Sequence, residues 1–254
     1  MTDEVRTEAR DGVLLITLDR PEARNAVNAA VAHGVAEAVE RLESEDDLRV
    51  GVLTGAGGTF CSGMDLKAFM TGESPFVEGR GFGGITRRPP AKPMIAAVEG
   101  YAVAGGFELV LACDLVVAGA GAKLGVPEVK RSLVAAAGAA ILLPKRIPQA
   151  VAMELLLTGD PVGAERAAAL GLVNRVVEDG AALDGALELA ARIAANGPLA
   201  VAATKQIATA THDWSSEQAW TEQDRLTAAV FGSEDAMEGA AAFAEKRDPV
   251  WKGR

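Results

Sequence analysis

The stretch Gly100-Tyr-Ala-Val-Ala-Gly-Gly-Phe-Glu-Leu-Val-Leu-Ala-Cys-Asp114 decides how the rest of the chain is interpreted. Glu108 is its only carboxylate before the final aspartate, and its neighbours are small or apolar. Gly105 and Gly106 stand where a helix would begin. A carboxylate without a partner is costly to bury, so such a group is paired, neutralised or used in chemistry. The stretch therefore predicts a helix whose first turn carries a functional glutamate.

Length, charge and composition limit the class of protein. The chain has 254 residues, a net charge of -10, 49% hydrophobic residues and only 4% aromatic residues. We expect one large domain, or one domain with a small appendage, whose core is built from Ala, Val, Leu and Gly. The acidic balance weighs against binding of nucleic acid, which normally uses a basic surface.

No segment has the pattern of a targeting or membrane-spanning sequence. The first residues, Met-Thr-Asp-Glu-Val-Arg, lack the apolar region of a secretory signal. The longest apolar run, residues 133–144, has twelve residues, whereas a membrane span needs roughly 20. The two cysteines, Cys61 and Cys113, form neither a disulfide framework nor a metal-binding spacing. We expect a soluble, cytoplasmic protein with free thiols and no membrane partner.

Hydrophobic periodicity predicts strands that alternate with helices, followed by a mostly helical tail. The expected strands are 13–18, 50–54, 93–98, 115–118 and 172–177. The expected helices are 28–44, 65–70, 149–157, 164–170, 181–196, 199–211, 215–231 and 234–246. This order predicts an α/β core over residues 1–195 and a helical C-terminal region over residues 196–254. The tryptophans Trp214 and Trp220 of the tail fit either core or oligomer contacts.

Residues 71–90 differ from the rest in composition. They hold five glycines and three prolines with few candidates for the core. We interpret them as a long mobile loop. Such a loop is either a dispensable surface connection or a lid that contacts a ligand.

Two segments share one order of features: residues 50–70 and residues 94–113 each run from an apolar strand through small residues into a helix start. Neither has a dinucleotide-binding, P-loop or hydrolase-elbow motif. Small residues before a helix present backbone N–H groups to a ligand, and two convergent N–H groups form an oxyanion hole. Gly105 is the natural donor of the second segment, and Glu108 lies one turn further on the same face. The alternative is a first-turn glutamate that merely supports the helix N-terminus.

Glu128 is a second candidate carboxylate. It follows Pro127 at the start of a predicted helix, so it can equally serve only to complement the helix dipole. Paired with Glu108, it would suit general acid–base catalysis. The solitary histidines His33 and His212 have no catalytic partners at a recognisable spacing, and we expect both on the surface.

At these residues the chain resembles the enoyl-CoA hydratase/isomerase (crotonase) family. The resemblance covers nearly the whole length and rests on five motifs in the family's order. They are Asp19-Arg-Pro-Glu-Ala-Arg-Asn-Ala26, Gly57-Gly-Thr-Phe-Cys-Ser-Gly-Met-Asp-Leu-Lys67, Lys92-Pro-Met-Ile-Ala-Ala-Val-Glu-Gly-Tyr-Ala-Val-Ala-Gly-Gly-Phe-Glu108, Leu124-Gly-Val-Pro-Glu128, and Leu157-Thr-Gly-Asp160 with Ala169-Leu-Gly-Leu-Val173. Any one of them alone is weakly specific, whereas the set is highly specific.

The resemblance implies a crotonase-like α/β spiral of ββα repeats with a helical C-terminal trimerisation region, assembled as a homotrimer or a dimer of trimers. It implies an acyl-CoA thioester as substrate and no further cofactor or metal. The oxyanion donors would be the backbone N–H groups of Met64 and Gly105. Glu108 and Glu128 match the two glutamates of the hydratases, where the first activates water and the second handles the proton at the α-carbon. Both are present, which favours an enoyl-CoA hydratase of fatty-acid or related acyl-CoA degradation.

The resemblance also implies residues that bind coenzyme A. By position these are Arg24, Ala26, Ser62, Asp65, Leu66 and Lys67. The basic residues Arg87, Arg88 and Lys92 fit either phosphate contacts or plain surface charges.

One segment departs from the family. The family's hydratases carry a glycine-rich turn ending in Gly-Gly-Thr-Gln-Arg-Leu, whereas this chain has Leu133-Val-Ala-Ala-Ala-Gly-Ala-Ala-Ile141. The segment borders the acyl pocket in relatives, so the substrate need not be a simple short enoyl chain. The alternatives are an isomerase, a dehydratase of a hydroxyacyl- or carnitinyl-CoA, or a protein that binds acyl-CoA without turning it over.

Overall fold

The computed structural model describes residues 4–254. Residues 1–3, part of the segment in which we expect no secretory signal, lie outside it. The fold begins with an antiparallel hairpin of β1 (Val5–Arg10) and β2 (Val13–Leu18), joined by a two-residue turn. Asp11 and Gly12 in this turn have φ angles of 50° and 79°, the left-handed pair that a tight hairpin requires.

The main sheet has the order β1-β2-β3-β6-β8-β11, and all neighbours after the hairpin are parallel. Its further strands are β3 (Val50–Gly55), β6 (Met94–Val98), β8 (Leu115–Gly119) and β11 (Arg175–Val177). A second sheet has the order β10-β9-β7 and contains β7 (Tyr101–Val103), β9 (Lys123–Gly125) and β10 (Val162–Gly163).

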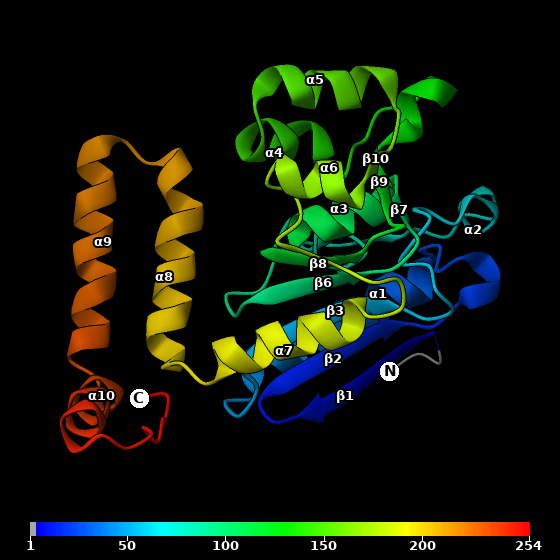
Figure 1. Ribbon diagram of the computed structural model, residues 1–254. Helices are drawn as coiled ribbons and strands as arrows, with labels where there is room; N and C mark the ends of the chain where they lie inside the picture. Colours follow the sequence, from blue (N-terminus) through cyan, green and yellow to red (C-terminus); the bar gives the residue numbers. More distant parts are fainter. Residues whose placement is uncertain (1–3) are drawn as a thin grey trace.

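Side chains alternate between the two faces of the main sheet, as the period of two in a strand requires. One face packs under α7 (Ala182–Ala194), which buries an alanine at every fourth position, and α7 lies across the sheet in Figure 1. The other face packs against α1 (Ala29–Ser44), where Leu14, Ile16 and Leu53 join the larger of two hydrophobic clusters. A core this rich in alanine lets helix and sheet approach closely.

The remaining elements extend this frame. The helices are α2 (Leu66–Met70), α3 (Gly105–Ala112), α4 (Ala139–Arg146), α5 (Gln149–Thr158) and α6 (Ala164–Ala169), with 3₁₀ turns η1 (Pro21–Ala23) and η2 (Pro127–Arg131). All five strands expected from the sequence form, although β11 covers only the end of its predicted range. The predicted helices form as well, including the one that begins at Gly105, except that the helix expected to start at Pro127 is only the 3₁₀ turn η2.

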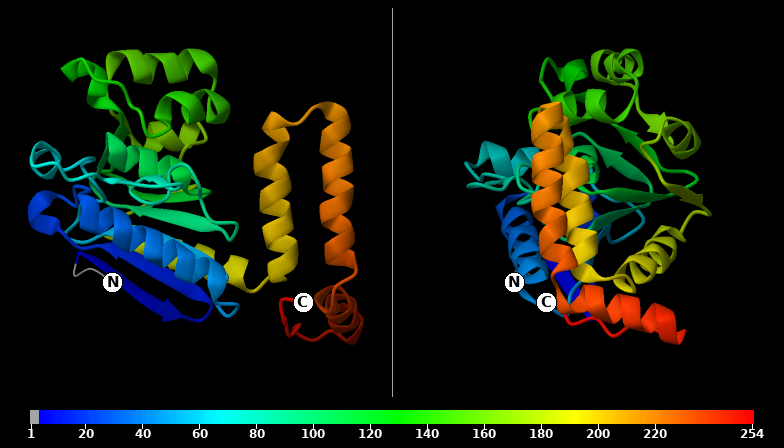
Figure 2. Two further views of the ribbon diagram at one scale, coloured as in Figure 1. Left: turned by 180° about the vertical axis from the view of Figure 1, so that it is seen from behind. Right: turned by 90° about the vertical axis from the view of Figure 1, so that its left-hand side faces the viewer.

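The C-terminal region stands beside the core rather than on it. Helices α8 (Pro198–Ala210) and α9 (Ser216–Phe231) form an antiparallel pair, linked by η3 (Thr211–Asp213) and followed by α10 (Glu234–Glu245) (Figures 1 and 2). Neither α8 nor α9 contains a buried residue. The boundary between residues 195 and 196 stays a prediction. Burial changes in the link between α7, which buries alanines against the sheet, and α8, which buries no residue.

The segment 71–90 packs more tightly than its composition predicts. It contains a short hairpin of β4 (Phe76–Val77) and β5 (Gly81–Phe82), and residues 80–86 are all buried. Phe82 and Ile85 belong to the main hydrophobic cluster. The expectation of few core residues here is therefore wrong. Gly81, Gly83 and Gly84 serve close packing; a Cβ on Gly84, for example, would lie 2.3 Å from the carbonyl oxygen of Ala32 on α1.

Candidate active site

The two strand–loop–helix segments meet at one edge of the main sheet. Strands β3 and β6 are parallel neighbours, so the loops that follow them leave the sheet on the same side. Cys61 forms a parallel bridge with Ala102, with hydrogen bonds from Cys61 N to Tyr101 O (2.9 Å) and from Val103 N to Cys61 O (3.1 Å). The loop before α2 is thereby fixed against the start of α3.

This contact places the two predicted oxyanion donors in adjoining backbone segments. A Cβ on Gly63 would lie 3.2 Å from the amide nitrogen of Gly105, so the residue before Met64 and the first residue of α3 are in direct contact. Among the hydrogen bonds of residues 4–254, none has the N–H of Met64 or of Gly105 as its donor. Ala104, just before α3, has a φ of +53°, a strained value for a residue other than glycine. The arrangement leaves two neighbouring N–H groups free to bind an oxygen atom.

Glu108 lies on the first turn of α3 with 3% of its surface exposed. Its Oε1 accepts hydrogen bonds from the backbone N–H of Ala137 (2.7 Å) and of Ala139 (3.1 Å), on both sides of Gly138. Burial raises the pKa of Glu108 from 4.5 to about 7, and the charge of Glu128 adds to the rise, while these backbone N–H groups oppose it. A carboxyl group with such a pKa exchanges protons near neutral pH.

Glu128 stands on η2, partly buried and near enough for its charge to act on Glu108. Its Oε2 is buried and has no hydrogen-bond partner. Burial raises the pKa of Glu128, and the charge of Arg131 opposes the rise. The sequence-predicted pair of glutamates therefore does come together, with each carboxyl group destabilised in its charged form.

Two close contacts explain the double glycine at the start of α3. A Cβ on Gly105 would lie 2.4 Å from Cζ of Phe82, and a Cβ on Gly106 would lie 2.2 Å from the carbonyl oxygen of Cys61. Phe82 is buried, with 3% of its surface exposed. Sequence reasoning missed Phe82 as a neighbour of the site, although a large aromatic residue between Gly81 and Gly83 is a signal that the loop packs inward.

The predicted coenzyme A residues lie on two loops held together by their backbones. Ser62 N donates to Arg24 O (3.1 Å), and the Arg24 side chain is exposed. Ala26 is buried, whereas Leu66 and Lys67 are exposed on α2. These residues are thus brought together beside the Met64 amide, as the sequence predicts, and their contacts with coenzyme A stay a prediction.

Asp65 differs from this group because its carboxylate is already occupied. Its Oδ1 caps α2 by accepting from the N–H of Lys67 and of Ala68, and its Oδ2 accepts from Arg20 at 3.0 Å. Its backbone is engaged as well, because its N–H donates to Val27 O and its carbonyl accepts from Phe69 N, so Asp65 shapes the loop rather than offering a free group to coenzyme A. Sequence reasoning missed Arg20, although its place within the first family motif marks it.

The other basic candidates separate into two groups. Arg87 and Arg88 are exposed. Lys92 precedes β6, at the opposite end of the strand from the paired loops, and its Nζ donates to Glu45 O (2.8 Å). The strand runs between Lys92 and the site, so Lys92 is a surface charge at the far edge.

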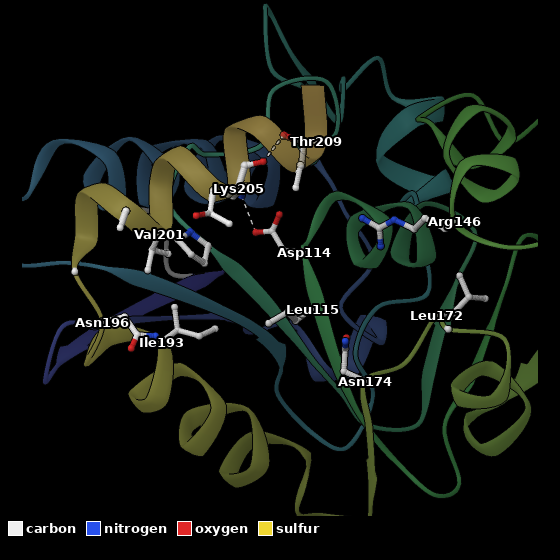
Figure 3. A pocket seen from close by; sticks show the side chains of 16 residues that line it. Asp114, Leu115, Arg146, Leu172, Asn174, Ile193, Asn196, Val201, Lys205 and Thr209 are labelled. Carbon is white, nitrogen blue, oxygen red and sulfur yellow. Dashed lines mark hydrogen bonds and ion pairs between the residues drawn. The ribbon is translucent and has the colours of Figure 1, made fainter. Parts of the chain in front are cut away.

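A cavity of about 670 Å³ lies at that far edge, between the sheet and α8. Figure 3 shows Lys205 of α8 pointing toward Asp114, and its Nζ bonds to Asp114 Oδ2 at 2.6 Å. Lys205 Nζ also donates to Lys92 O at 3.0 Å. These groups are engaged in holding α8 to the sheet, and the cavity includes neither glutamate nor either free N–H group.

The part of the chain that the structure describes offers neither a metal-binding cluster nor a membrane-spanning helix. In residues 4–254, no cluster of three or more histidine, cysteine, aspartate or glutamate side chains is arranged to hold a metal ion. No helix in the same residues is both long and apolar enough to cross a bilayer. Cys61 and Cys113 are buried free thiols, and burial raises the pKa of each to about 12.

Comparison with known proteins agrees with this geometry. The model of the enoyl-CoA hydratase/isomerase family matches residues 8–254. A carnitinyl-CoA dehydratase of Proteus mirabilis is 43% identical over all of both chains. The crystal structure of an enoyl-CoA hydratase from Mycobacterium tuberculosis H37Rv is 58% identical, covers 99% of each chain and superposes with a TM-score of 0.97. That of an enoyl-CoA hydratase from Mycobacterium marinum is 59% identical, with the same coverage and TM-score.

The architecture is the crotonase fold, as the sequence resemblance predicts. The chain belongs to the enoyl-CoA hydratase/isomerase family. The family assignment from sequence is confirmed, and so is the class of reaction at the level of hydratases and dehydratases.

Proposed function

We propose that the protein is an enoyl-CoA hydratase, which adds water across the 2,3 double bond of a 2-enoyl-CoA. The observation that carries this proposal is the position of Glu108. It is a buried carboxyl group with a pKa of about 7, one turn after the free N–H of Gly105 and near Glu128. The proximity of the free N–H of Gly105 to Glu108 on one helix turn, and the charge that Glu128 exerts on Glu108, support a site in which donors and proton carriers act on one substrate.

The reaction follows from these groups. The N–H groups of Met64 and Gly105 donate to the thioester oxygen and stabilise the negative charge that gathers there as water attacks C3. Glu108, as the carboxylate, takes the proton from the attacking water. Glu128, as the carboxylic acid, gives a proton to C2. Water is thereby split into a hydroxyl group on C3 and a hydrogen on C2, and proton exchange with solvent returns both glutamates to their starting states.

The chemistry needs no cofactor besides the coenzyme A carried by the substrate. Each N–H group in an oxyanion hole is typically worth about 10²–10³ in rate. The exposed cations Arg24 and Lys67 have no ion pair among the described residues and would meet the phosphates of coenzyme A. Degradation of fatty acids or related acyl groups is the process this activity fits.

The first test follows the loss of enoyl thioester absorbance with crotonyl-CoA and longer or branched enoyl-CoA substrates. Glu108→Gln and Glu128→Gln should each lower kcat by at least about 10²-fold, in the range general acid–base groups supply. Full activity in either variant would contradict the role of that glutamate.

The oxyanion role of Gly105 needs a matched pair of variants. Any Cβ at this position meets Phe82, so Gly105→Pro alone would confuse crowding with loss of the N–H. Gly105→Ala adds the same Cβ and keeps the N–H, whereas proline, which the first position of a helix tolerates, removes it. We expect Gly105→Pro to be at least about tenfold slower than Gly105→Ala. Equal rates in two folded variants would rule the donor out.

The relatives favour a second candidate, dehydration of a carnitinyl-CoA. The Proteus mirabilis protein named for that reaction is 43% identical over the whole chain. Dehydration is the same chemistry in reverse, so the two glutamates would exchange the same protons. The assay that separates the two compares the kcat/KM of crotonyl-CoA with that of the unsaturated counterpart of carnitinyl-CoA, which carries a quaternary ammonium group.

We further propose that the protein assembles as a homotrimer or a dimer of trimers through its C-terminal helices. Large apolar side chains are exposed there, among them Trp220 (67%), Phe231 (78%), Met237 (72%) and Phe243 (88%). Such a surface is covered in a stable protein. Size-exclusion chromatography with light scattering measures the mass of the assembly. A monomer at micromolar protein concentration would refute the proposal. A cytoplasmic location belongs to the same proposal, since both cysteines are free.

A further inference from the structure

A buried ion cluster beside the site has no part in the chemistry described above. Arg20 follows β2, and only 14% of its side chain is exposed. Its Nη1 donates to Asp65 Oδ2 (3.0 Å) and to Ala26 O (2.6 Å), and its Nε lies 3.1 Å from Glu4 Oε1. A buried guanidinium with these partners fixes their relative positions, because losing one of them leaves an uncompensated charge.

One residue of this cluster, Asp65, is next in the sequence to a proposed oxyanion donor, Met64. Asp65 directly follows Met64, and its N–H donates to Val27 O (2.9 Å), while Val27 N donates to Gly63 O (2.8 Å). The peptide groups on both sides of Met64 are therefore held by Val27 in a parallel bridge. The Met64 N–H shares a peptide plane with Gly63 O, so its direction is set by the bond from Val27 N, and the bond from Asp65 N to Val27 O holds the other side of the same bridge.

The anchor of Asp65 is its side chain. Oδ1 accepts from the N–H of Lys67 (3.0 Å) and of Ala68 (3.1 Å), which seats the start of α2 on Asp65. Oδ2 accepts from Arg20, which joins α2 and Asp65 to the loop after β2. Arg20 also binds Ala26 O, the carbonyl just before Val27, so one guanidinium group holds both strands of the bridge.

We infer that Arg20 is a positioning residue, which acts through Asp65 and Ala26 to aim the Met64 N–H at the thioester oxygen. This inference rests on the proposed function, since the N–H matters only if it binds that oxygen. Arg20 itself touches no reacting atom. Hydrogen bonds weaken steeply as the donor turns away from the acceptor, so a small rotation of this peptide would lower the rate.

The cluster offers a matched control. Glu4 pairs with the same guanidinium but precedes β1, and it has no bond to the loop that carries Met64. Glu4→Gln therefore removes an ion pair of Arg20 without releasing Asp65. Asp65→Asn leaves the Glu4 pair in place and releases Asp65 from Arg20. Its amide oxygen can still cap α2, but the charge that holds Arg20 is lost. Arg20→Lys keeps the positive charge but has one nitrogen on a flexible stem in place of the planar guanidinium, whose Nη1 reaches Asp65 and Ala26 while its Nε faces Glu4.

The experiment has two readouts. The first is kcat and KM for crotonyl-CoA. The second is the absorbance maximum of a bound chromophoric thioester, para-dimethylaminocinnamoyl-CoA, whose shift on binding reports how strongly the carbonyl is polarised. Arg20→Lys and Asp65→Asn should lower kcat about tenfold, part of the loss expected for removal of a whole donor. Both should reduce the shift, while Glu4→Gln leaves both readouts close to wild type.

Two results would overturn the assignment. One is a loss of kcat in Arg20→Lys and Asp65→Asn with an unchanged absorbance shift. The other is an equal loss in Glu4→Gln, which would make the cluster merely structural. If Arg20→Lys does not fold, Asp65→Asn carries the comparison with Glu4→Gln. Failure of the proposed function is distinguishable, because the shift requires only that the thioester binds and not that any enoyl-CoA turns over.

Discussion

Replacing the buried glutamate of the site should stabilise the protein at alkaline pH and change little in acid. Glu108 has a pKa of about 7 in the folded chain against an ordinary value of 4.5. Between these values the unfolded chain binds fewer protons than the folded one. Stability must therefore fall as the pH rises through this window. Glu108→Gln removes the titrating group, so the variant does not lose this stability as the pH rises.

The size of the effect follows from the pKa. A pKa about 2.5 above its ordinary value corresponds to about 3 kcal/mol lost once the pH is well above 7. At pH 5 less than about 1 kcal/mol of this is lost already. The variant's free energy of unfolding minus that of wild type is therefore the quantity to compare. It should be about 2.5 kcal/mol larger at pH 8 than at pH 5. Glutamine conserves the acceptor for the N–H groups of Ala137 and Ala139, so the packing stays comparable.

The assay is urea unfolding of both proteins at pH 5 and pH 8, at one protein concentration because assembly adds to apparent stability. Titrating groups that do not interact with Glu108 cancel in the comparison of the two proteins, whereas Glu128 is coupled to it. Glu188→Gln, at an exposed position of α7, is the control and should show no such pH dependence. The reasoning is refuted if Glu108→Gln is equally destabilised, or equally stabilised, at both pH values.

The remaining predictions concern the rate, a glycine and the anchor of α8. The value of kcat/KM should fall about tenfold per pH unit below pH 7, as Glu108 becomes protonated and stops acting as a base; a flat profile down to pH 5 would contradict this. Gly106→Ala should destabilise the protein by at least about 2 kcal/mol in urea unfolding, because its Cβ would lie 2.2 Å from the carbonyl oxygen of Cys61. An unchanged stability would show that the backbone shifts to make room and would contradict this prediction. Lys205→Met should cost about 2 kcal/mol by the same measurement, since its ion pair is only 12% exposed on the lysine side. The matched change at the exposed Lys145 should cost less than about 1 kcal/mol, and equal costs would count against the anchor.

Elements of the fold with strong local patterns could be predicted from the sequence, and those formed by pairing could not. The strand over residues 13–18 and the helix from Ala29 to Ser44 carry clear periodicity, and both form where expected. Strand β1 was not predicted, because as an edge strand it alternates charged and small residues rather than apolar ones. Its signal was the Asp11-Gly12 turn. Strand β7 has three residues and is defined by pairing with β9 on one side and by the bridge to Cys61 on the other, which no local pattern reveals.

The site divides in the same way. The spacing from Gly105 to Glu108 is local helix geometry, so their common face could be predicted from the sequence alone. The positions of Met64 and Glu128 relative to them came from the family resemblance, since both depend on how distant loops pack. The bonds from residues 137 and 139 to Glu108 could not be predicted, because backbone groups leave no mark in a sequence.

The altered segment after Glu128 takes on a more definite meaning from these bonds. Its Leu-Val-Ala-Ala-Ala-Gly-Ala-Ala-Ile run lacks the polar end that the family resemblance leads us to expect, from which the sequence predicts that the substrate need not be a simple short enoyl chain. The structure shows that the run holds Glu108 through the N–H groups of Ala137 and Ala139, on either side of Gly138, whose φ is +129°. A glycine is required there by the backbone, whereas the neighbouring side chains are free to vary. The substitutions therefore leave the support of the glutamate in place.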